Sequence, residues 1–427
     1  MSRKAMAILF AGLMLASAPA VQGAGFLIYE HGAAAMAIAG AFTGLANDPS
    51  AIWHNPAGLA WVEGTQLLLG GTLIVPSGSL TMDNLPGAPV YKQVKQRFFP
   101  PNFYLTSKLS DRLAIGVGVF APFGLGTEWP NEANDFPLRY LAVMSEMQTI
   151  QINGAIAYKL SDNFSVGGGV YYVDSKLKED IVQAVQISPA LPVWDVPTTL
   201  DVKGTAFGWN AGLLFKSERF SFGVNYRSRF DVDYEGTVVS STAYVPEAYQ
   251  AYIPTEGDGV VTFKFPDILT FGLAVRLTDN LTWSADIHDY LWKRYDSYVV
   301  EVDYPDPYPD MELAAAPAWK NNLCYRTGLQ FEASDSLTLR GGFAYDVAPQ
   351  PIEDMSPSLP DANRIIFTAG FGYRIGKLVL DFAYQYEQFA KRTSDHHYIF
   401  GPGTPNLAAG TYKTSSHLFG LNLGYRF

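Results

Sequence analysis

The chain has 427 residues, of which 48% are hydrophobic and 14% aromatic, and its net charge at pH 7 is −11. Proteins that bind nucleic acid present a concentrated basic face, so this acidic balance argues against a nucleic-acid partner. Cys324 is the single cysteine, which excludes an internal disulfide framework.

The first 23 residues have the pattern of a secretory signal peptide. A short basic start precedes an apolar run over residues 5–16, and small residues follow it. Cleavage fits after Ala20 or after Gly23. No later stretch contains the 18 or more apolar residues that a spanning helix needs. We therefore expect an exported chain without an inner-membrane helix.

Residues 24–61 show no strand alternation and are rich in alanine and glycine. This composition suits a compact segment that precedes the first strand. A disordered tail on the periplasmic side is the alternative. Scattered apolar side chains favour the compact segment: Phe26, Ile28, Met36, Ile38, Phe42, Ile52 and Trp53.

From residue 62 onward, the chain repeats the alternation that is typical of half-buried strands. In residues 378–387, leucines and aromatic residues share one face, while Asp381, Gln385 and Glu387 share the other. Residues 220–227 and 281–288 follow the same rule. A single such strand also fits a soluble sandwich, so the turns have to decide the fold class.

The turns favour a transmembrane barrel. Six short polar turns separate alternating runs: Ser110-Asp111, Ser161-Asp162, Ser217-Glu218, Thr278-Asp279, Ser334-Asp335 and Gly376-Lys377. Seven longer connections lie between them, near residues 76–94, 130–140, 180–202, 238–258, 297–317, 347–362 and 390–411. Short turns at one end and long loops at the other are the signature of outer-membrane barrels. We predict an all-β fold, a barrel of fourteen antiparallel strands over residues 62–427.

The end of the chain fits a closed barrel in the outer membrane of a Gram-negative bacterium. The last strand alternates up to Phe427, the final residue, and must pair with the first strand because a barrel has no free edge. Eight strands leave an interior that side chains fill, whereas 16 to 18 leave an aqueous channel. With fourteen strands we expect residues 24–61 to form a hatch that plugs the lumen.

Several motifs, in order along the mature chain, carry a family resemblance. They are Ala24-Gly25-Phe26, Asn55-Pro56-Ala57, Phe123-Gly124-Leu125-Gly126-Thr127-Glu128-Trp129, Gly208-Trp209-Asn210-Ala211-Gly212, Tyr226-Arg227-Ser228, Trp319-Lys320, Pro360-Asp361 with Arg364, and the C-terminal residues 410–427. With this ordered set the chain resembles the FadL/TodX family of outer-membrane transporters for hydrophobic compounds. One departure is Cys324, where family members often carry an arginine.

The resemblance implies the roles of the matching residues. Asn55, Pro56 and Ala57 would be the hatch motif, and Ala24, Gly25 and Phe26 would lie near an inner binding pocket. The resemblance also implies a cation for a carboxylate head group. Lys320 and Arg326 are the candidates, since Arg326 faces the same side as position 324.

The family pattern further implies a capture groove in the extracellular loops. The connection over residues 181–196 is strongly apolar although it contains two prolines, and an exposed apolar patch usually marks a binding site. We expect Ile187, Leu191, Val193 and Trp194 to line this groove. The alternative is that these side chains pack loop against loop and merely cap the barrel.

The third strand contains a candidate opening in the barrel wall. Residues 113–119 alternate, and then Ala121, Pro122, Phe123 and Gly124 interrupt the pattern. Proline has no N–H to donate to the ladder, and glycine commonly marks a bulge. The resemblance places a kink in the same strand and implies lateral exit of the substrate. Alternatively, Pro122 only ends the strand at the membrane surface.

The predicted function is therefore outer-membrane transport of hydrophobic molecules, with long-chain fatty acids favoured. Uptake of aromatic hydrocarbons and a general diffusion porin are the alternatives. No G-x-S-x-G, P-loop or H-E-x-x-H motif occurs, so we expect no enzyme, cofactor or metal site. The expected partners are outer-membrane lipids, a hydrophobic substrate and the barrel-assembly machinery, which would engage the strand ending in Phe427. We expect a monomer.

Overall fold

The computed structural model describes residues 25–83, 85–131, 135–188, 190–394 and 410–427. The expected signal peptide, Ala24 and most of the connection predicted at residues 390–411 lie outside this range. No helix in the described ranges is long and apolar enough to cross a membrane.

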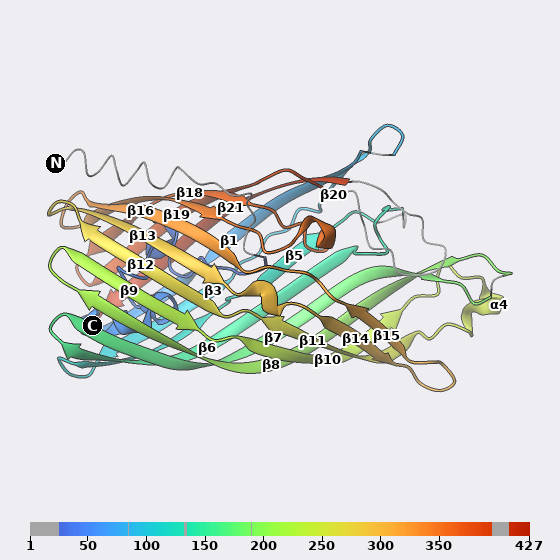
Figure 1. Ribbon diagram of the computed structural model, residues 1–427, viewed down its shortest axis with the longest axis horizontal. Helices are drawn as coiled ribbons and strands as arrows, with labels where there is room; N and C mark the ends of the chain where they lie inside the picture. Colours follow the sequence, from blue (N-terminus) through green and yellow to red (C-terminus); the bar gives the residue numbers. More distant parts are fainter. Residues whose placement is uncertain (1–24, 84, 132–134, 189, 395–409) are drawn as a thin grey trace.

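The described strands form one closed antiparallel sheet (Figure 1). The segments are β1 (Thr65–Met82), β2 (Val90–Lys92), β3 (Pro101–Lys108), β4 (Leu113–Phe120), β5 (Gly124–Glu128), β6 (Met144–Ser161), β7 (Phe164–Val185), β8 (Trp194–Lys216), β9 (Phe220–Arg227), β10 (Phe230–Ser240), β11 (Glu256–Phe265), β12 (Ile268–Arg276), β13 (Leu281–Tyr290), β14 (Tyr298–Asp303), β15 (Met311–Ala315), β16 (Asn322–Glu332), β17 (Leu337–Asp346), β18 (Arg364–Ile375), β19 (Leu378–Phe389), β20 (Arg392–Ser394) and β21 (Gly410–Arg426). Seven barrel strands are interrupted once, so these 21 segments make fourteen strands, as predicted.

The barrel closes through its first and last strands. β1 pairs with β21 from Gln66 opposite Arg426 to Met82 opposite Gly410, and its other edge pairs with β3. All six predicted short turns lie between paired strands, at the end of the barrel that also carries the C terminus (Figure 1). By the usual arrangement of outer-membrane barrels this is the periplasmic end.

The prediction of an irregular connection over residues 180–202 is wrong for most of that range. β7 continues to Val185 and β8 begins at Trp194, so only residues 186–193 lie between the two strands. Trp194 and Val196 are buried and alternate with less buried neighbours. The prolines in this stretch obscured that alternation, although Pro197 lies in register opposite Val182 within the hairpin.

The same correction applies to three other connections. Strands continue into the predicted loops at residues 76–94 and 238–258, as far as Met82 and Ser240. The loop predicted at residues 297–317 consists mainly of β14 and β15, which pair with each other. Pairing saturates backbone N–H and C=O groups, so strands that leave the membrane remain stable as ribbons.

The two faces of the barrel wall differ as the alternation predicts. In β19, the side chains of Asp381, Ala383, Gln385 and Glu387 are buried, whereas the neighbouring apolar and aromatic side chains are more exposed. The buried polar face lines the lumen and the apolar face points outward. A soluble sandwich would have the reverse arrangement, so the wall belongs in a membrane.

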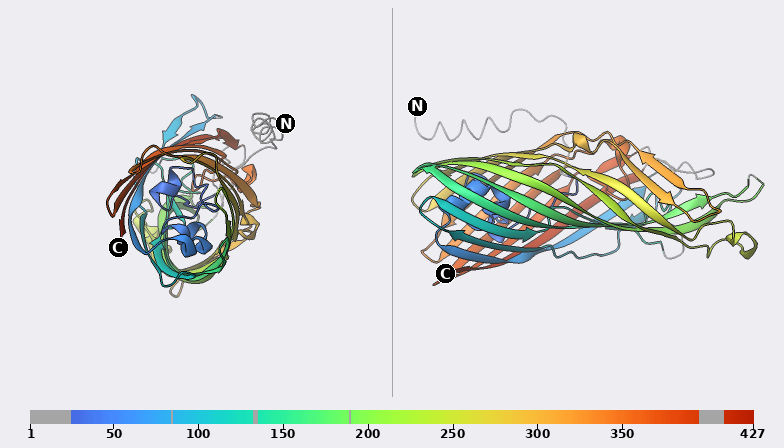
Figure 2. Two further views of the ribbon diagram at one scale, coloured as in Figure 1. Left: turned by 90° about the vertical axis from the view of Figure 1, so that its left-hand side faces the viewer. Right: turned by 90° about the horizontal axis from the view of Figure 1, so that it is seen from below.

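Residues 25–61 lie inside the barrel and form the hatch (Figure 2, left). Its short helices are α2 (Ala33–Met36), α3 (Ala51–His54) and the 3-10 helix η1 (Pro56–Trp61), and outside it lie α4 (Glu247–Gln250), η2 (Trp292–Arg294) and η3 (Ile352–Asp354). The hatch approaches the wall closely where strands carry glycine. A Cβ on Gly272 would lie 2.6 Å from the Gly44 nitrogen, and one on Gly223 would lie 2.3 Å from the Thr43 oxygen.

Hydrogen bonds from the wall hold the hatch in this position. The Asp286 carboxylate accepts the backbone N–H groups of Phe42 and Thr43 at 3.0 and 2.9 Å. The Asn55 side chain donates to the carbonyl oxygens of Thr43 and Leu213, and its own oxygen accepts the Ala57 N–H. Asn55 therefore caps η1 and connects the hatch to β8. Pro56 and Ala57 pack where Gly167 of β7 leaves room.

Candidate functional site

The third barrel strand is interrupted between β4 and β5. Phe120 pairs with Gln151 of β6 and Gly124 with Gln148, so the three residues 121–123 lie opposite only two. This is a β-bulge, which bends its strand and breaks the ladder locally. The Thr149 hydroxyl of β6 fixes the bulge, because it donates to the Phe123 carbonyl at 2.7 Å and accepts the Phe123 N–H at 2.9 Å.

The interruption leaves the second and third barrel strands unpaired over several residues. In the described residues, no backbone hydrogen bond joins these strands between the pair Phe103–Val119 and the bond from the Val94 N–H to the Glu128 oxygen. The N-terminal part of the hatch occupies the free edge instead. Ile28 donates to the Pro122 oxygen at 2.8 Å and Gly124 donates to the Phe26 oxygen at 3.0 Å.

A cavity of about 470 Å³ lies at this gap. It is bounded by the hatch, the bulged strand, β6, the second strand and the connection before β18. Its lining includes Gly25, Phe26, Leu27, Glu30, Phe99, Ala121, Phe123, Gly124, Ile150, Asp361, Arg364 and Glu387. Ile150 alternates with the lumenal Thr149 and Gln151 and is 37% exposed. The cavity therefore reaches from the lumen to the outer face of the wall.

Phe26 and Phe123 line this cavity, and further aromatic rings pack around Phe26. The ring of Phe26 lies 4.7 Å from that of Trp292, 5.8 Å from Phe265 and 6.1 Å from Phe123. Trp319 packs against the same group, at 6.0 Å from Phe26. These rings provide an apolar wall into which an alkyl chain or an aromatic molecule can be buried.

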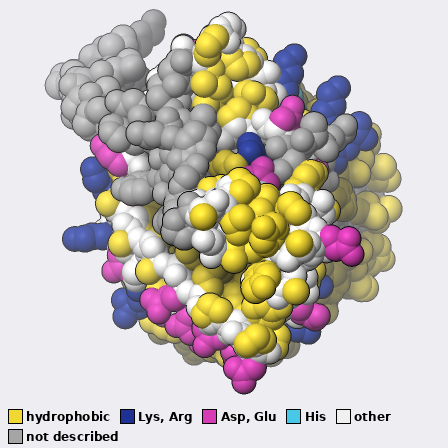
Figure 3. Space-filling model, turned by 90° about the vertical axis from the view of Figure 1, so that its right-hand side faces the viewer, with side chains coloured by type: hydrophobic (Ala, Val, Ile, Leu, Met, Phe, Trp, Pro, Cys, Tyr) yellow, Lys and Arg dark blue, Asp and Glu magenta, His cyan; other side chains and the backbone are white. Residues whose placement is uncertain are grey.

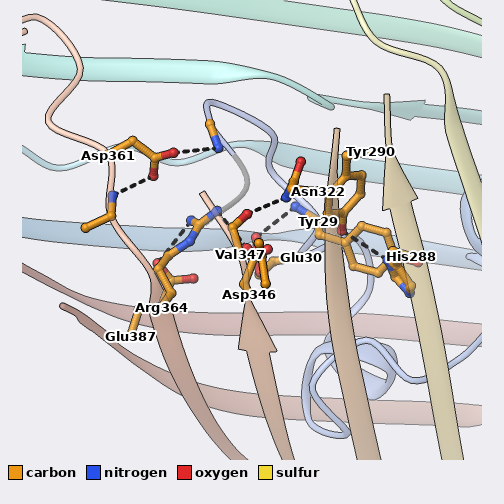
Figure 4. A network of polar contacts seen from close by, with 12 residues as sticks. Tyr29, Glu30, His288, Tyr290, Asn322, Asp346, Val347, Asp361, Arg364 and Glu387 are labelled. Atoms are coloured by element: carbon orange, nitrogen blue, oxygen red, sulfur yellow. Dashed lines mark hydrogen bonds and ion pairs between the residues drawn. The ribbon is translucent and has the colours of Figure 1, made fainter. Parts of the chain in front are cut away.

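The polar part of the cavity is a network around Arg364 (Figure 4). The Arg364 guanidinium lies 2.9 Å from the Asp346 carboxylate and 3.6 Å from that of Glu387. Asp361, in the connection before β18, accepts the Gly25 N–H at 3.2 Å and so ties the start of the hatch to the wall. Burial raises the pKa of the Asp361 carboxyl to about 7.

The structure brings together some predicted site residues and separates others. Gly25, Phe26 and Ala121, Phe123 and Gly124 share the cavity, and Pro122 lies within the bulge. Ala24 lies outside the described residues. Asn55, Pro56 and Ala57 lie elsewhere in the hatch and do not line the cavity. Their expected role in the hatch remains a prediction.

Neither candidate cation lines the cavity. Arg326 donates to the Ala39 oxygen at 2.9 Å, and its guanidinium lies 4.3 Å from the centre of the Tyr29 ring, so the hatch encloses it. Lys320 is exposed on the connection before β16. The enclosed guanidinium in the cavity is that of Arg364, which the sequence analysis named only as part of a motif. The alternation in β18 places Arg364 on the lumenal face, and this position could have identified it as a candidate cation.

The loop residues predicted to form a capture groove belong to an apolar cluster. Trp194 stacks on Tyr249 with a ring separation of 5.0 Å, and Ile187 and Leu191 pack with Val245 and Ile253. Val193 lies outside this cluster. Figure 3 shows hydrophobic side chains gathered in patches over this end of the barrel. The cluster joins two loops, as the packing alternative requires, and the capture role remains a prediction.

The chain has relatives that cover nearly its whole length. A model of the family described as "Outer membrane protein transport protein (OMPP1/FadL/TodX)" matches residues 14–427. Outer membrane protein P1 of Haemophilus influenzae is 27% identical over 98% of both chains. The long-chain fatty acid transport protein of an Escherichia coli O6:H1 strain is 24% identical over 95% of this chain and 94% of its own.

Two solved structures share the fold. A FadL homologue from Pseudomonas aeruginosa superposes with a TM-score of 0.82 at 19% identity, covering 95% of this chain and 100% of its own. The toluene transporter TbuX of Ralstonia pickettii gives 0.72 at 20% identity, covering 93% and 99%. Fatty-acid and toluene transporters are thus both among the similar proteins.

Proposed function

Since the chain belongs to the OMPP1/FadL/TodX family of outer-membrane transport proteins, we propose that it takes up long-chain fatty acids and similar hydrophobic molecules from outside the cell. The observation that carries this proposal is the cavity, which combines an aromatic inner wall with an opening at the unpaired edge of the third strand. Aromatic hydrocarbons are the second candidate, because TbuX and TodX are named as toluene transporters.

The proposed route has three steps. A molecule is captured on the apolar loop cluster, moves into the cavity beside Phe26, and leaves sideways through the gap next to Pro122. The extended strands β7 and β8 support the first step, because the connection between them carries the partly buried Ile187 and Leu191 of the loop cluster. The cavity supports the second and third steps, because it touches both the hatch and the outer face of β6.

The hatch argues against a general diffusion porin. It occupies the lumen, where its backbone groups are hydrogen-bonded to the wall side chains of Asp286 and Thr368. The side chain of Asn55 in the hatch also donates to the Leu213 oxygen of the wall. A porin keeps a water-filled channel at this place. The family consists of transport proteins, and we propose that this chain likewise has no enzymatic activity.

We further propose outer-membrane lipids as the immediate surroundings of the barrel. Large apolar side chains on the outer face are exposed, among them Val170, Phe207 and Leu421 at 71%, 76% and 53%. Among the described residues, β1 and β21 close the wall and the hatch covers the free edge of the third strand, so no strand edge needs a second copy, which fits a monomer. Phe427 ends the closing strand, where the assembly machinery would engage it.

An uptake assay tests the proposed function directly. Expression of the full-length chain in a Gram-negative strain that lacks its own transporter should restore uptake of labelled oleate, and labelled toluene provides the second substrate. A porin substrate of similar mass, such as a disaccharide, should not enter faster. Uptake of both labelled molecules at the level of the empty vector would reject the proposal.

Changing Leu191, Val193 and Trp194 together to serine should weaken capture without impairing assembly, because these residues lie beyond the membrane. Burying such a side chain contributes about 1.5–3 kcal/mol, so even partial contact predicts a several-fold loss of oleate affinity. Val193→Ser alone is the matched control, since Val193 lies outside the cluster. If the triple variant is only more sensitive to protease, with unaltered uptake at low substrate concentration, the cluster has a packing role.

A further inference from the structure

Among the described residues that line the cavity, the enclosed cation already has partners. Among the described lining residues the guanidinium groups are those of Arg97 and Arg364. Arg97 is exposed to solvent, where an ion pair contributes little. The Arg364 side chain is only 11% exposed and bridges the carboxylates of Asp346 and Glu387 (Figure 4). In the described part of the cavity the charge of the enclosed cation is therefore already compensated by two carboxylates, although the Arg364 Nε–H has no hydrogen-bond partner.

The other ionisable groups of the cavity are acidic. Four carboxyl groups line it, those of Glu30, Glu146, Asp361 and Glu387. The Gln385 amide joins two of them, because it donates to Glu30 at 2.9 Å and to Glu387 at 2.8 Å. An ionised carboxylate only accepts hydrogen bonds and has about four acceptor positions. The polar end of the cavity thus offers acceptors to a ligand that can donate.

We propose, on the basis of the transport function above, that this cavity selects hydrophobic molecules with an uncharged head group that donates a hydrogen bond, such as an alcohol or a protonated carboxylic acid, over carboxylate anions. An anion would have to lie against Glu30 and Glu387, where like charges repel. Alternatively it would displace Glu387 from Arg364 and leave a buried carboxylate without its cation, which is strongly unfavourable. A hydroxyl group meets neither obstacle.

Two amphiphiles of equal chain length isolate the effect of the head group. Oleate and oleyl alcohol bury the same alkyl chain, so the hydrophobic contribution cancels in the ratio of their Kd values. At pH 8, competition against a fluorescent lipid on the purified full-length protein should show oleyl alcohol binding about tenfold more tightly or better, since like-charge contacts are costly in a buried site. Equal or tighter binding of oleate would overturn the inference.

Glu387→Gln tests the proposed cause. This change removes one carboxylate and leaves Arg364 with Asp346 alone, so the preference for the alcohol over oleate should fall about tenfold. Asp111→Asn in a short turn removes the same charge far from the cavity and should leave the ratio unchanged. If Glu387→Gln fails to fold, Glu30→Gln in the hatch should shift the ratio in the same direction. An unchanged ratio in a folded variant contradicts the assignment.

The outcomes also separate this inference from the proposed function. If neither amphiphile binds the wild-type protein, the transport function is rejected and the inference falls with it. If both bind and oleate binds at least as well, transport stands and the head-group selection is wrong.

Discussion

Deleting residues 26–57 should convert the protein into an open channel that no longer transports selectively. The barrel is closed by β1 and β21, which pair over 17 residues without any help from the hatch. The deletion removes the segment that fills the lumen and that lines the cavity through Phe26, Leu27 and Glu30. We expect a heat-modifiable barrel with a large rise in ion conductance in planar bilayers, and no saturable uptake of oleate.

A milder variant distinguishes loss of the hatch from damage to the barrel. In Gly272→Ala, the new Cβ would lie 2.6 Å from the Gly44 backbone nitrogen, so the hatch must shift. Gly154→Ala is the matched control, because no atom lies within 4 Å of its Cβ position. We expect intermediate conductance for the first variant and wild-type conductance for the second. If the deletion leaves conductance unchanged, the hatch does not plug the lumen.

The barrel could be predicted because its signal is local. Each strand crosses the membrane once, with one face toward lipid and the other toward the lumen, so its own residues alternate, as in residues 378–387. Together with a polar turn such as Gly376-Lys377, this alternation is enough to predict a hairpin. The parts of the strands that extend beyond the membrane could not be predicted, because this local alternation is weaker there. Around Trp194 and Pro197 neither lipid nor a polar lumen enforces a clean pattern, and pairing with the neighbouring strand determines the structure.

The site could be predicted only in part because it depends on non-local contacts. The interruption at Pro122 and Gly124 is visible in the sequence, since proline and glycine weaken a strand locally. The bridge from Leu27 to Phe123 joins segments almost a hundred residues apart, and the sequence pattern of neither segment predicts it. The role of Arg364 likewise depends on Asp346 and Glu387, which lie on two other strands.

The proposal of lateral exit rests on the free energy of the substrate. An alkyl chain of about 16 carbons gains roughly 0.8 kcal/mol per buried CH₂, or on the order of 13 kcal/mol in all. Release along the axis into the aqueous periplasm would lose most of this, whereas release into the membrane retains it. The gap beside Pro122 is closed by residues 26–28 of the hatch. We therefore expect this segment to leave the strand edge before a substrate passes.

A reversible disulfide between the hatch and the bulged strand should block this exit. Leu27 and Phe123 form an antiparallel bridge, and the bonds on either side, from Ile28 to Pro122 and from Gly124 to Phe26, make them a non-hydrogen-bonded pair. Such pairs have Cα atoms about 4.5 Å apart, which suits a disulfide. Oxidised Leu27→Cys with Phe123→Cys should bind oleate yet deliver almost none to the cell, and a reductant should restore delivery.

Comparing oxidised and reduced forms of one variant cancels any effect of losing the two side chains. The single variant Leu27→Cys, treated with the same oxidant, controls for other oxidation, since the native Cys324 is fully buried. Pro122→Val with Gly124→Val provides an independent test. A Cβ on Gly124 would lie 2.8 Å from the Ile28 side chain, and the valine N–H would restore a donor to the strand. Equal uptake by the oxidised and reduced double-cysteine protein would mean that the substrate leaves by another path, because the hatch would then be fixed across the gap while transport continued.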